Sequence, residues 1–174
     1  MQEEQLILVD ENDLPCGTEG KLKTHKKGLL HRAFSIIIYN KDHKILLQKR
    51  AAVKYHSAAL WANSCCGHPR VDENDIEAAK RRLHEELGFF CDLSKITEVT
   101  YNLPLDNGLY EHEYTHIFAG RYDGDVNPNP DEVSEIKWIS LESILEDFKI
   151  HPESYARWFQ LYLKDSKLIS QILQ

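Results

Sequence analysis

Short runs of alternating or contiguous apolar residues predict several strands along the chain. Residues 5–9 form the first run, and turn-forming residues follow it. Residues 31–40 alternate and then become continuously apolar, and residues 44–49 follow after a polar turn, so these two runs predict a hairpin. Later runs predict strands over residues 96–103, 111–121 and 132–139.

A helix is predicted over residues 74–87, where apolar side chains recur at helical spacing. Asn74 with Glu77 resembles a capping box, and Gly88 stands where a helix commonly ends. Two further helical patterns cover residues 141–147 and 152–164. Strands that precede and surround the first helix, with helices at the end, predict an α+β fold with a mixed sheet between helices.

The length and composition predict one globular domain over residues 1–174. Apolar residues make up 42% of the chain and charged residues 28%, as is typical of globular proteins. No apolar run approaches the roughly 20 residues that cross a bilayer. The acidic start lacks the basic and apolar segments of a signal peptide, so we expect a cytoplasmic protein without a membrane partner. We also expect a monomer or a weak homodimer.

The net charge of -7, without any basic stretch, argues against nucleic acid as a partner. An anionic ligand must therefore be held by a few local cations or by metal ions. A chain with an adequate core and no secretion signal does not need a disulfide framework. We therefore expect free thiols at Cys16, Cys65, Cys66 and Cys91.

The most informative segment covers residues 67–89. It contains, in order, Gly67, Glu73, Arg81, Leu83, Glu85, Glu86, Gly88 and Phe89. This spacing resembles the Nudix box, a loop-helix-loop motif whose helix carboxylates hold divalent metal against a diphosphate. One position departs, because Arg82 stands where the box usually has a glutamate. Pairs of arginine and glutamate one turn apart are also common on solvated helices, but the full match favours a functional segment.

Residues around the box narrow this resemblance. Cys66 and His68 enter the motif, and Glu111 and Glu113 follow in a later strand. The chain resembles the type I isopentenyl diphosphate isomerases over residues 21–158, which implies a Nudix-like fold. It also implies the interconversion of isopentenyl and dimethylallyl diphosphate, a small-molecule substrate pair. Two rival functions are a Nudix pyrophosphohydrolase, disfavoured by the missing box glutamate, and a non-catalytic metal-binding module, which leaves the cysteine unexplained.

A metal site is predicted from five donors. His25, His31 and His68 offer imidazole nitrogens, and Glu111 and Glu113 direct their carboxylates to one face of a strand. Three nitrogens and two carboxylates suit Zn²⁺ or Mn²⁺, although any single histidine is more often a surface or core residue. The family's ligand set excludes the remaining histidines, His43, His56, His84, His112, His116 and His151.

The resemblance also implies catalytic roles. Cys66 comes directly before the glycine of the Gly-His-Pro step and is the expected catalytic thiol, favoured as a thiolate by cationic surroundings. Spacing alone does not exclude the neighbouring Cys65 as the catalytic thiol. Glu113 is our hypothesis for the proton donor, tuned by its metal ion and by the Tyr101 hydroxyl.

The remaining predicted contacts concern the substrate. The resemblance assigns phosphate binding to Lys21, Arg50, Lys54 and Arg82. A second ion, Mg²⁺, is expected between Glu86 and the diphosphate oxygens. Trp61 and Trp158 are expected in the pocket wall, where the ring of Trp158 would stabilise a carbocation by about 2 kcal/mol or more. Taken singly, each of the four basic residues is more often a solvated surface cation, and each tryptophan can also be explained as a packed aromatic.

Overall fold

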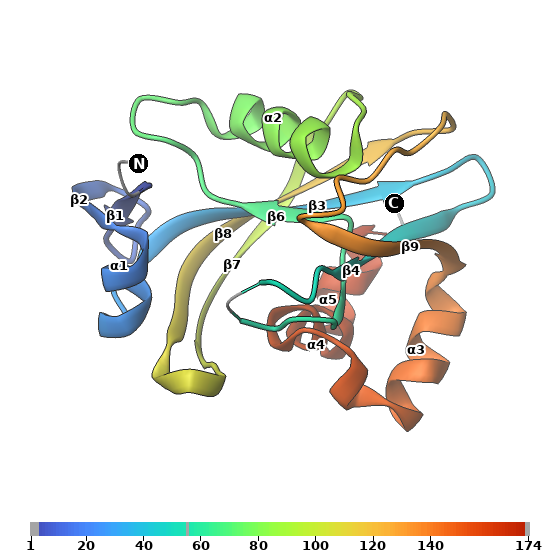
Figure 1. Ribbon diagram of the computed structural model, residues 1–174. Coiled ribbons are helices and arrows are strands. Elements are labelled where there is room, and N and C mark those ends of the chain that lie inside the picture. The colour runs from blue at the N-terminus through green and yellow to red at the C-terminus, as the bar shows by residue number, and fades with distance from the viewer. Residues whose placement is uncertain (1–3, 55, 173–174) are drawn as a thin grey trace.

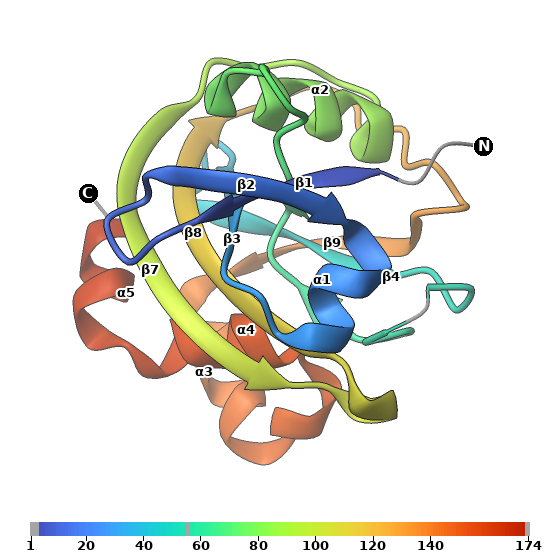
Figure 2. The same ribbon diagram turned by 90° about the vertical axis from the view of Figure 1, so that its left-hand side faces the viewer.

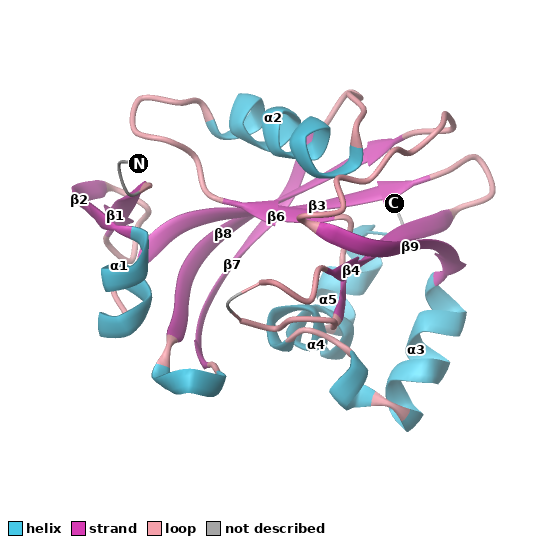
Figure 3. Cartoon of the chain, in the orientation of Figure 1, coloured by secondary structure: helices cyan, strands magenta, loops and turns pink. Residues whose placement is uncertain are grey.

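The computed structural model describes residues 4–54 and 56–172 (Figure 1). Within them, nine strands join into one mixed sheet, which Figure 3 separates from the helices by colour. The strands are β1 (Gln5–Val9), β2 (Pro15–Gly20), β3 (His31–Tyr39), β4 (Lys44–Arg50), β5 (Trp61–Ala62), β6 (Cys65–Gly67), β7 (Ser94–Pro104), β8 (Tyr110–Arg121) and β9 (Val133–Ser140).

Strand β3 is the centre of the sheet because it pairs along both edges. On one edge it runs parallel to β8, from His31 opposite Glu113 to Tyr39 opposite Arg121. On the other edge it pairs antiparallel with β1, β6 and β4. Strand β7 then pairs with β8, and β9 with β4. Residues of β6 and β8 are thereby brought to either side of one strand.

Helices cover both faces of this sheet. They are α1 (Lys21–Lys27), α2 (Asp75–Leu87), α3 (Leu141–Ile150), α4 (Arg157–Lys164) and α5 (Ser166–Ile172), with short 3-10 turns at Asp106–Gly108 and Pro152–Ser154. Helix α2 lies on one face, and α3, α4 and α5 lie on the other (Figure 1). Helix α1 follows the N-terminal hairpin of β1 and β2, which faces the viewer in Figure 2. None of the helices described is long and apolar enough to cross a membrane.

Alternation along β3 supplies a core on each face. Phe34, Ile36 and Ile38 pack under α2, and Ile37 lies in the opposite core with Tyr162 of α4. Because successive side chains of a strand point to opposite faces, a continuously apolar strand is what a sheet covered on both sides requires. The predicted α+β fold with a mixed sheet between helices is confirmed.

Helix α2 begins and ends where the sequence predicted. The side chain of Asn74 accepts a hydrogen bond from the Ile76 N–H at 3.0 Å, which satisfies one free donor of the first turn. Gly88 adopts φ 78° and donates its N–H to the His84 carbonyl, a left-handed C-cap that suits glycine. The helix that carries the box is therefore fixed at both ends by local chemistry.

Other elements differ from the prediction. The predicted hairpin of β3 and β4 is confirmed at Tyr39 opposite Ile45. The predicted helix over residues 152–164 is interrupted, because the Ala156 N–H donates to the Trp61 carbonyl at 2.8 Å instead of to its own helix. Strands β2 and β6 and helices α1 and α5 were not predicted, because their sequences lack a sustained apolar period.

A charged network ties the β1–β2 turn to the sheet and to α2. His116 contacts the carboxylates of Asp13 at 2.8 Å and Asp75 at 3.0 Å, and Arg32 donates to Asp13 at 2.7 Å. Burial by itself lowers the pKa of His116, and Lys95 lowers it further, but the two carboxylates outweigh both and leave the pKa raised. The protonated form of His116 is thus the one that stabilises the fold.

We predict that Asp75→Asn destabilises the protein by about 1 to 3 kcal/mol at pH ~6, because it removes a charged hydrogen-bond partner of His116. The loss should shrink towards pH ~9, since a raised pKa gives stability that is present below the unfolded value and disappears as pH rises through the folded value. Urea unfolding at both pH values measures this.

Glu77→Gln is the matched control, because it removes another first-turn carboxylate of α2 that pairs with Lys80. It should show no such pH dependence. An equal loss at both pH values for Asp75→Asn would contradict the role of His116.

Candidate active site

A cavity of about 190 Å³ lies where β6, β8 and α2 approach β3, and most of its lining side chains are polar or charged. Most of the predicted site residues line it, namely Lys21, Arg50, Lys54, Cys66, His68, Arg82, Glu86, Tyr101, Glu111, Glu113 and Trp158. His25 and His31 are almost fully buried and contact His68 of this lining. Trp61 is the predicted site residue that neither lines the cavity nor contacts its histidines.

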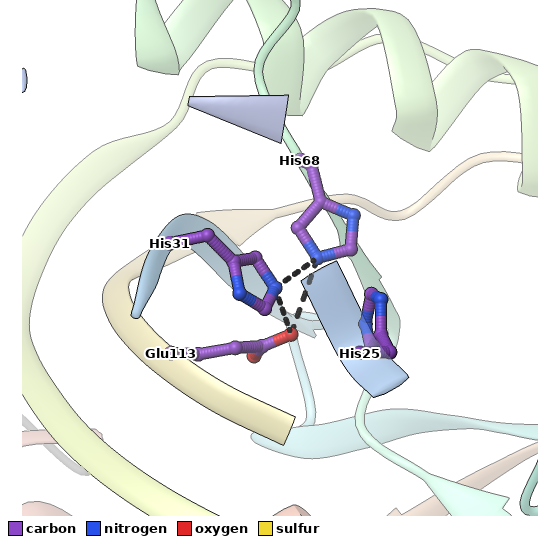
Figure 4. Close-up of side chains that lie close together, drawn as sticks. All are labelled: His25, His31, His68 and Glu113. Carbon is purple, nitrogen blue, oxygen red and sulfur yellow. Dashed lines mark hydrogen bonds and ion pairs between the residues drawn. The ribbon is translucent and has the colours of Figure 1, made fainter. Parts of the chain in front are cut away.

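Four of the five predicted metal ligands form one cluster (Figure 4). Their ligand atoms all lie within 4.8 Å of one another, and they come from α1 (His25), the start of β3 (His31), the segment directly after β6 (His68) and β8 (Glu113). The Nε2 atom of His68 lies 3.2 Å from the Nε2 atom of His31 and 3.2 Å from Glu113 Oε1. The parallel pairing of His31 with Glu113 brings two of these donors together.

Hydrogen bonds behind the cluster orient its imidazoles. The Nδ1 atom of His25 lies 2.7 Å from the Lys21 carbonyl, and that of His31 lies 2.9 Å from the Leu29 carbonyl. A carbonyl only accepts, so each Nδ1 carries the proton and each Nε2 offers a lone pair. Burial lowers the pKa of His25, and lowers that of His68 to about 4, so both rings are neutral. Neutral imidazoles with free lone pairs are the form that binds a metal ion.

The two glutamates of β8 differ in their surroundings. Burial favours the neutral form of Glu113, but its close contacts with the imidazoles of His31 and His68 outweigh burial and lower its pKa well below the usual range. Burial, and then the charge of Glu113, raise the pKa of Glu111 well above the usual range. Among the described residues, Glu111 Oε2 is buried without a hydrogen-bond partner. Three neutral imidazoles with the Glu113 carboxylate, and a second carboxylate with an unpartnered oxygen in the same cavity, fit a borderline divalent cation such as Zn²⁺ or Mn²⁺.

Arg82 and Glu86 face the cavity from α2. Glu86 is buried, pairs with Arg82 and accepts a hydrogen bond from Gln48 Nε2 at 2.9 Å. Arg82 also lies 2.8 Å from Glu85 and 3.5 Å from Glu132. The residue that departs from the box thus brings a guanidinium to the cavity, next to the carboxylate expected to hold Mg²⁺.

The other predicted phosphate-binding cations have different partners. Lys21 pairs with Glu4 at 2.8 Å, and Lys54 pairs with Glu132. The guanidinium of Arg50 lies 5.2 Å from the ring centroid of Trp158, which is within the range of a cation–π contact. These cations gather at one cavity although the chain as a whole is acidic.

The structure separates the two neighbouring cysteines. Cys65 is fully buried in the core under α2, whereas Cys66 lines the cavity. The Cys66 sulfur accepts a hydrogen bond from Asn63 Nδ2 at 3.2 Å and lies 3.3 Å from Ser35 Oγ. Burial raises the pKa of Cys66 to about 12 even though the hydrogen bonds from Ser35 and Asn63 lower it. These surroundings favour the thiol, and the thiolate expected from the sequence stays a prediction.

Tyr101 and the two tryptophans are placed as follows. The Tyr101 hydroxyl donates to Glu113 Oε2 at 2.5 Å, from the position directly opposite Glu113 in the β7–β8 pair. The Trp158 indole N–H donates to Asn63 Oδ1 at 3.1 Å. The ring of Trp61 lies 4.1 Å from Lys137 Nζ, outside the cavity lining. Substrate contact by Trp61 stays a prediction.

The sequence analysis missed several residues of this site. Asn63 links Cys66 to Trp158, and Ser35 links Cys66 to Tyr162 through a contact of 2.9 Å. His56, which the family pattern excluded as a ligand, lines the cavity. Burial, and then the charge of Arg50, lower the pKa of His56 to about 3. No spacing rule marks these residues, because loops and distant strands bring them together.

Comparison with known proteins identifies close relatives. The NUDIX domain family model matches residues 29–161. Isopentenyl-diphosphate Delta-isomerase 2 of Photorhabdus laumondii is 51% identical over 158 residues, which is 91% of this chain and 89% of the relative. Isopentenyl-diphosphate Delta-isomerase 1 of Aromatoleum aromaticum is 49% identical with the same two coverages. The isopentenyl-diphosphate Delta-isomerase of Serratia proteamaculans is 44% identical, covering 94% of this chain and 91% of the relative.

Solved structures share the fold at low identity. A crystal structure from Deinococcus radiodurans superposes with a TM-score of 0.71 at 19% identity, covering 88% of this chain and 92% of that chain. The MutT protein of Methanosarcina mazei gives a TM-score of 0.67 at 21% identity, covering 83% and 96%. At such identities the likeness concerns the fold alone.

We predict that Mn²⁺ or Zn²⁺ stabilises the protein, because an ion that binds only the folded state adds about 2.7 kcal/mol at a hundred times its Kd. That free energy corresponds to a rise of roughly 5 to 10 °C in Tm for a chain of this size. His68→Ala should lose most of this rise, whereas His84→Ala, which removes a histidine stacked on Phe90 away from the cluster, should keep it. Thermal unfolding with and without ion measures the effect, and an undiminished rise in His68→Ala would contradict the site.

Proposed function

This chain belongs to the isopentenyl-diphosphate Delta-isomerases of the NUDIX family, and on that premise we propose how its residues carry out the isomerisation. The reaction puts a proton on the terminal methylene carbon of isopentenyl diphosphate and removes one from the saturated carbon that follows the double bond on the diphosphate side. The double bond thereby moves by one position and gives dimethylallyl diphosphate. An acid and a base must reach two different carbons of one small substrate.

Glu113 is the proposed acid and Cys66 the opposing base, with the two roles exchanged in the reverse direction. The observation that carries this proposal is that Cys66 from β6 and Glu113 from β8 line one cavity from strands on opposite edges of β3. Tyr101 supports Glu113, because its hydroxyl donates to the carboxylate and fixes one oxygen. The pair shares one proton. In the forward direction Glu113 must carry that proton and Cys66 must be a thiolate, so one proton has to move from the sulfur to the carboxylate before isopentenyl diphosphate is protonated.

The proposed intermediate is a tertiary carbocation, which must be kept from water. Trp158 lines the cavity and is held through its indole N–H, so the orientation of its ring is fixed. An aromatic face next to a desolvated cation contributes about 2 kcal/mol or more. Trp158 is therefore the proposed wall of the hydrocarbon part of the pocket.

Diphosphate binding is assigned to Lys21, Arg50, Lys54 and Arg82. Glu86 is the proposed protein ligand for Mg²⁺, since it is a buried carboxylate beside Arg82. When bound, Mg²⁺ supplies positive charge that neutralises phosphate oxygens. The donor set of His25, His31, His68, Glu111 and Glu113 is assigned to one Zn²⁺ or Mn²⁺, which supplies a fixed positive charge beside the proposed acid.

The contacts of the box favour isomerisation over hydrolysis of the diphosphate. Arg81 donates to Glu73 at 2.7 and 2.8 Å and to Glu85 at 3.2 Å, so both carboxylates brace the loop against the helix. Glu86 is the carboxylate of the box that lines the cavity, and Arg82 occupies the position of a further one. A hydrolase needs carboxylates on this helix that bind metal ions and activate water. At position 82 this helix instead presents the guanidinium of Arg82 to the cavity.

The decisive experiment incubates the metal-loaded protein with isopentenyl diphosphate in deuterated water and follows the product by NMR. We expect dimethylallyl diphosphate that carries deuterium, because protonation draws on exchangeable protein hydrogens. Release of phosphate without such a product would instead support a pyrophosphohydrolase. Substrate returned unchanged, with metal bound, would support the non-catalytic module.

We predict that Cys66→Ala lowers kcat by at least about a hundredfold, the lower end of what a positioned acid or base contributes. Glu113→Gln should be equally damaging. Substrate binding should stay measurable in both variants, because the diphosphate is held by other residues. Steady-state kinetics and binding titrations measure these effects.

Cys65→Ala is the matched control, since it removes the neighbouring thiol from the core under α2 and not from the cavity. It should keep kcat close to wild type with a modest loss of stability. The opposite ranking of the two cysteine variants would show that the proposed thiol is wrong.

A further inference from the structure

His56 reaches the cavity from the loop between β4 and β5. Its side chain is only 8% exposed, although it comes from a connecting segment. Its ring centroid lies 6.2 Å from that of His25, nearly parallel, and 6.1 Å from that of Trp158, edge-on. An imidazole thus packs between a predicted metal ligand and the proposed pocket wall.

The polar side of this ring faces Glu111. The Nδ1 atom of His56 lies 3.6 Å from Glu111 Oε1 and 3.4 Å from the hydroxyl of the next residue, Ser57. The side chains of His56 and Glu111 are both less than a tenth exposed. The other oxygen, Oε2, is buried without a hydrogen-bond partner among the described residues. Oε1 of Glu111 therefore lies next to the His56 imidazole, and Oε2 is available to bind a different partner.

Glu111 also lies outside the compact ligand cluster that contains Glu113. Both glutamates project from the same face of β8, so their like charges favour keeping the carboxylates apart. A carboxylate in that position needs a fixed hydrogen-bond partner to hold one oxygen and turn the other towards a cation.

We infer that His56 is a positioning residue for Glu111, whose Nδ1–H holds Oε1 and leaves Oε2 for the metal ion; this inference rests on the metal centre of the proposed function. The gap of 3.6 Å is a few tenths longer than a hydrogen bond. Contacts of this kind are often long without ligands and shorten in the loaded site.

The same loop holds a second group of the site. The His56 carbonyl accepts a hydrogen bond from Arg50 Nη2 at 3.3 Å, and Arg50 lies over the ring of Trp158. His56 thereby joins the carboxylate side of the cavity to a proposed phosphate-binding residue. A substitution of the side chain removes the contact with Glu111 and leaves this backbone contact available, so metal binding should suffer more than the KM for substrate.

The test compares His56→Leu, which lacks the N–H, with His56→Asn, whose side-chain amide keeps a donor near the Nδ1 position. Affinity for Mn²⁺ is measured without substrate by competition with a chromophoric chelator. We expect His56→Leu to bind Mn²⁺ about 10 to 100 times more weakly, the usual effect of removing a group that orients a ligand. His56→Asn should recover most of that loss, and His84→Leu, on the far side of α2 from the cavity, should bind like wild type.

A double-mutant cycle separates positioning from general damage. If His56 acts through Glu111, then adding His56→Leu to Glu111→Gln should weaken Mn²⁺ binding by no more than about twofold further, within the usual error of additivity. Two independent, additive losses would overturn the inference, as would undiminished affinity in His56→Leu.

Wild-type binding keeps the two proposals distinguishable. Absence of Mn²⁺ binding by the wild-type protein would remove the metal centre itself and the inference with it. Tight wild-type binding that does not respond to His56→Leu would remove only the role of His56. If His56→Leu does not fold, His56→Ala, which also lacks the N–H donor, replaces it in the same cycle with Glu111→Gln and in the comparison with His56→Asn.

Discussion

The buried carboxylate of Glu113 is the group on which the rest of the site depends. It is contacted by the imidazoles of His31 and His68 and by the hydroxyl of Tyr101. An ionised carboxylate in a protein interior is costly unless its oxygens are satisfied, so these three partners must be held in place by the fold. The β3–β8 register supplies His31, the β7–β8 register supplies Tyr101, and the segment after β6 supplies His68.

The helix of the box shows how a shared motif can serve a different reaction. Arg81 has a structural role, because its ion pairs with Glu73 and Glu85 connect the loop before α2 to the helix. Arg82, one position further, rotates by about 100° around the helix and therefore reaches the cavity. Replacing an acidic group by a guanidinium at that place removes a potential metal ligand and adds a bidentate partner for phosphate oxygens.

The cations of the site are organised by carboxylates. Lys54 and Arg82 share Glu132, and Lys21 pairs with Glu4. These carboxylates reduce the repulsion between the basic side chains that line the cavity. A diphosphate with its metal ion must compete with these carboxylates for the same side chains. That competition favours a ligand that brings several negative oxygens at once over one that brings a single charge.

The sequence by itself determined the elements and residues that follow a local rule. The helix over residues 74–87 followed from apolar spacing with a cap at each end, and the resemblance over residues 21–158 implied the residues of the site. Strand spacing sufficed to direct Glu111 and Glu113 to one face. Such features depend on the repeat of a helix or strand, which neighbouring residues fix among themselves.

Only the tertiary structure decided which side chains meet. It turned Cys66 to the cavity and Cys65 into the core, and it brought His56 and Asn63 to the site. It also interrupted the predicted helix at Ala156, whose N–H donates to the Trp61 carbonyl before α4 begins. Helix α1, rich in lysine and without an apolar period, forms against the hairpin and β8 that it contacts. These outcomes depend on pairing and burial between segments far apart in the chain, and no local repeat encodes the free energy of such contacts.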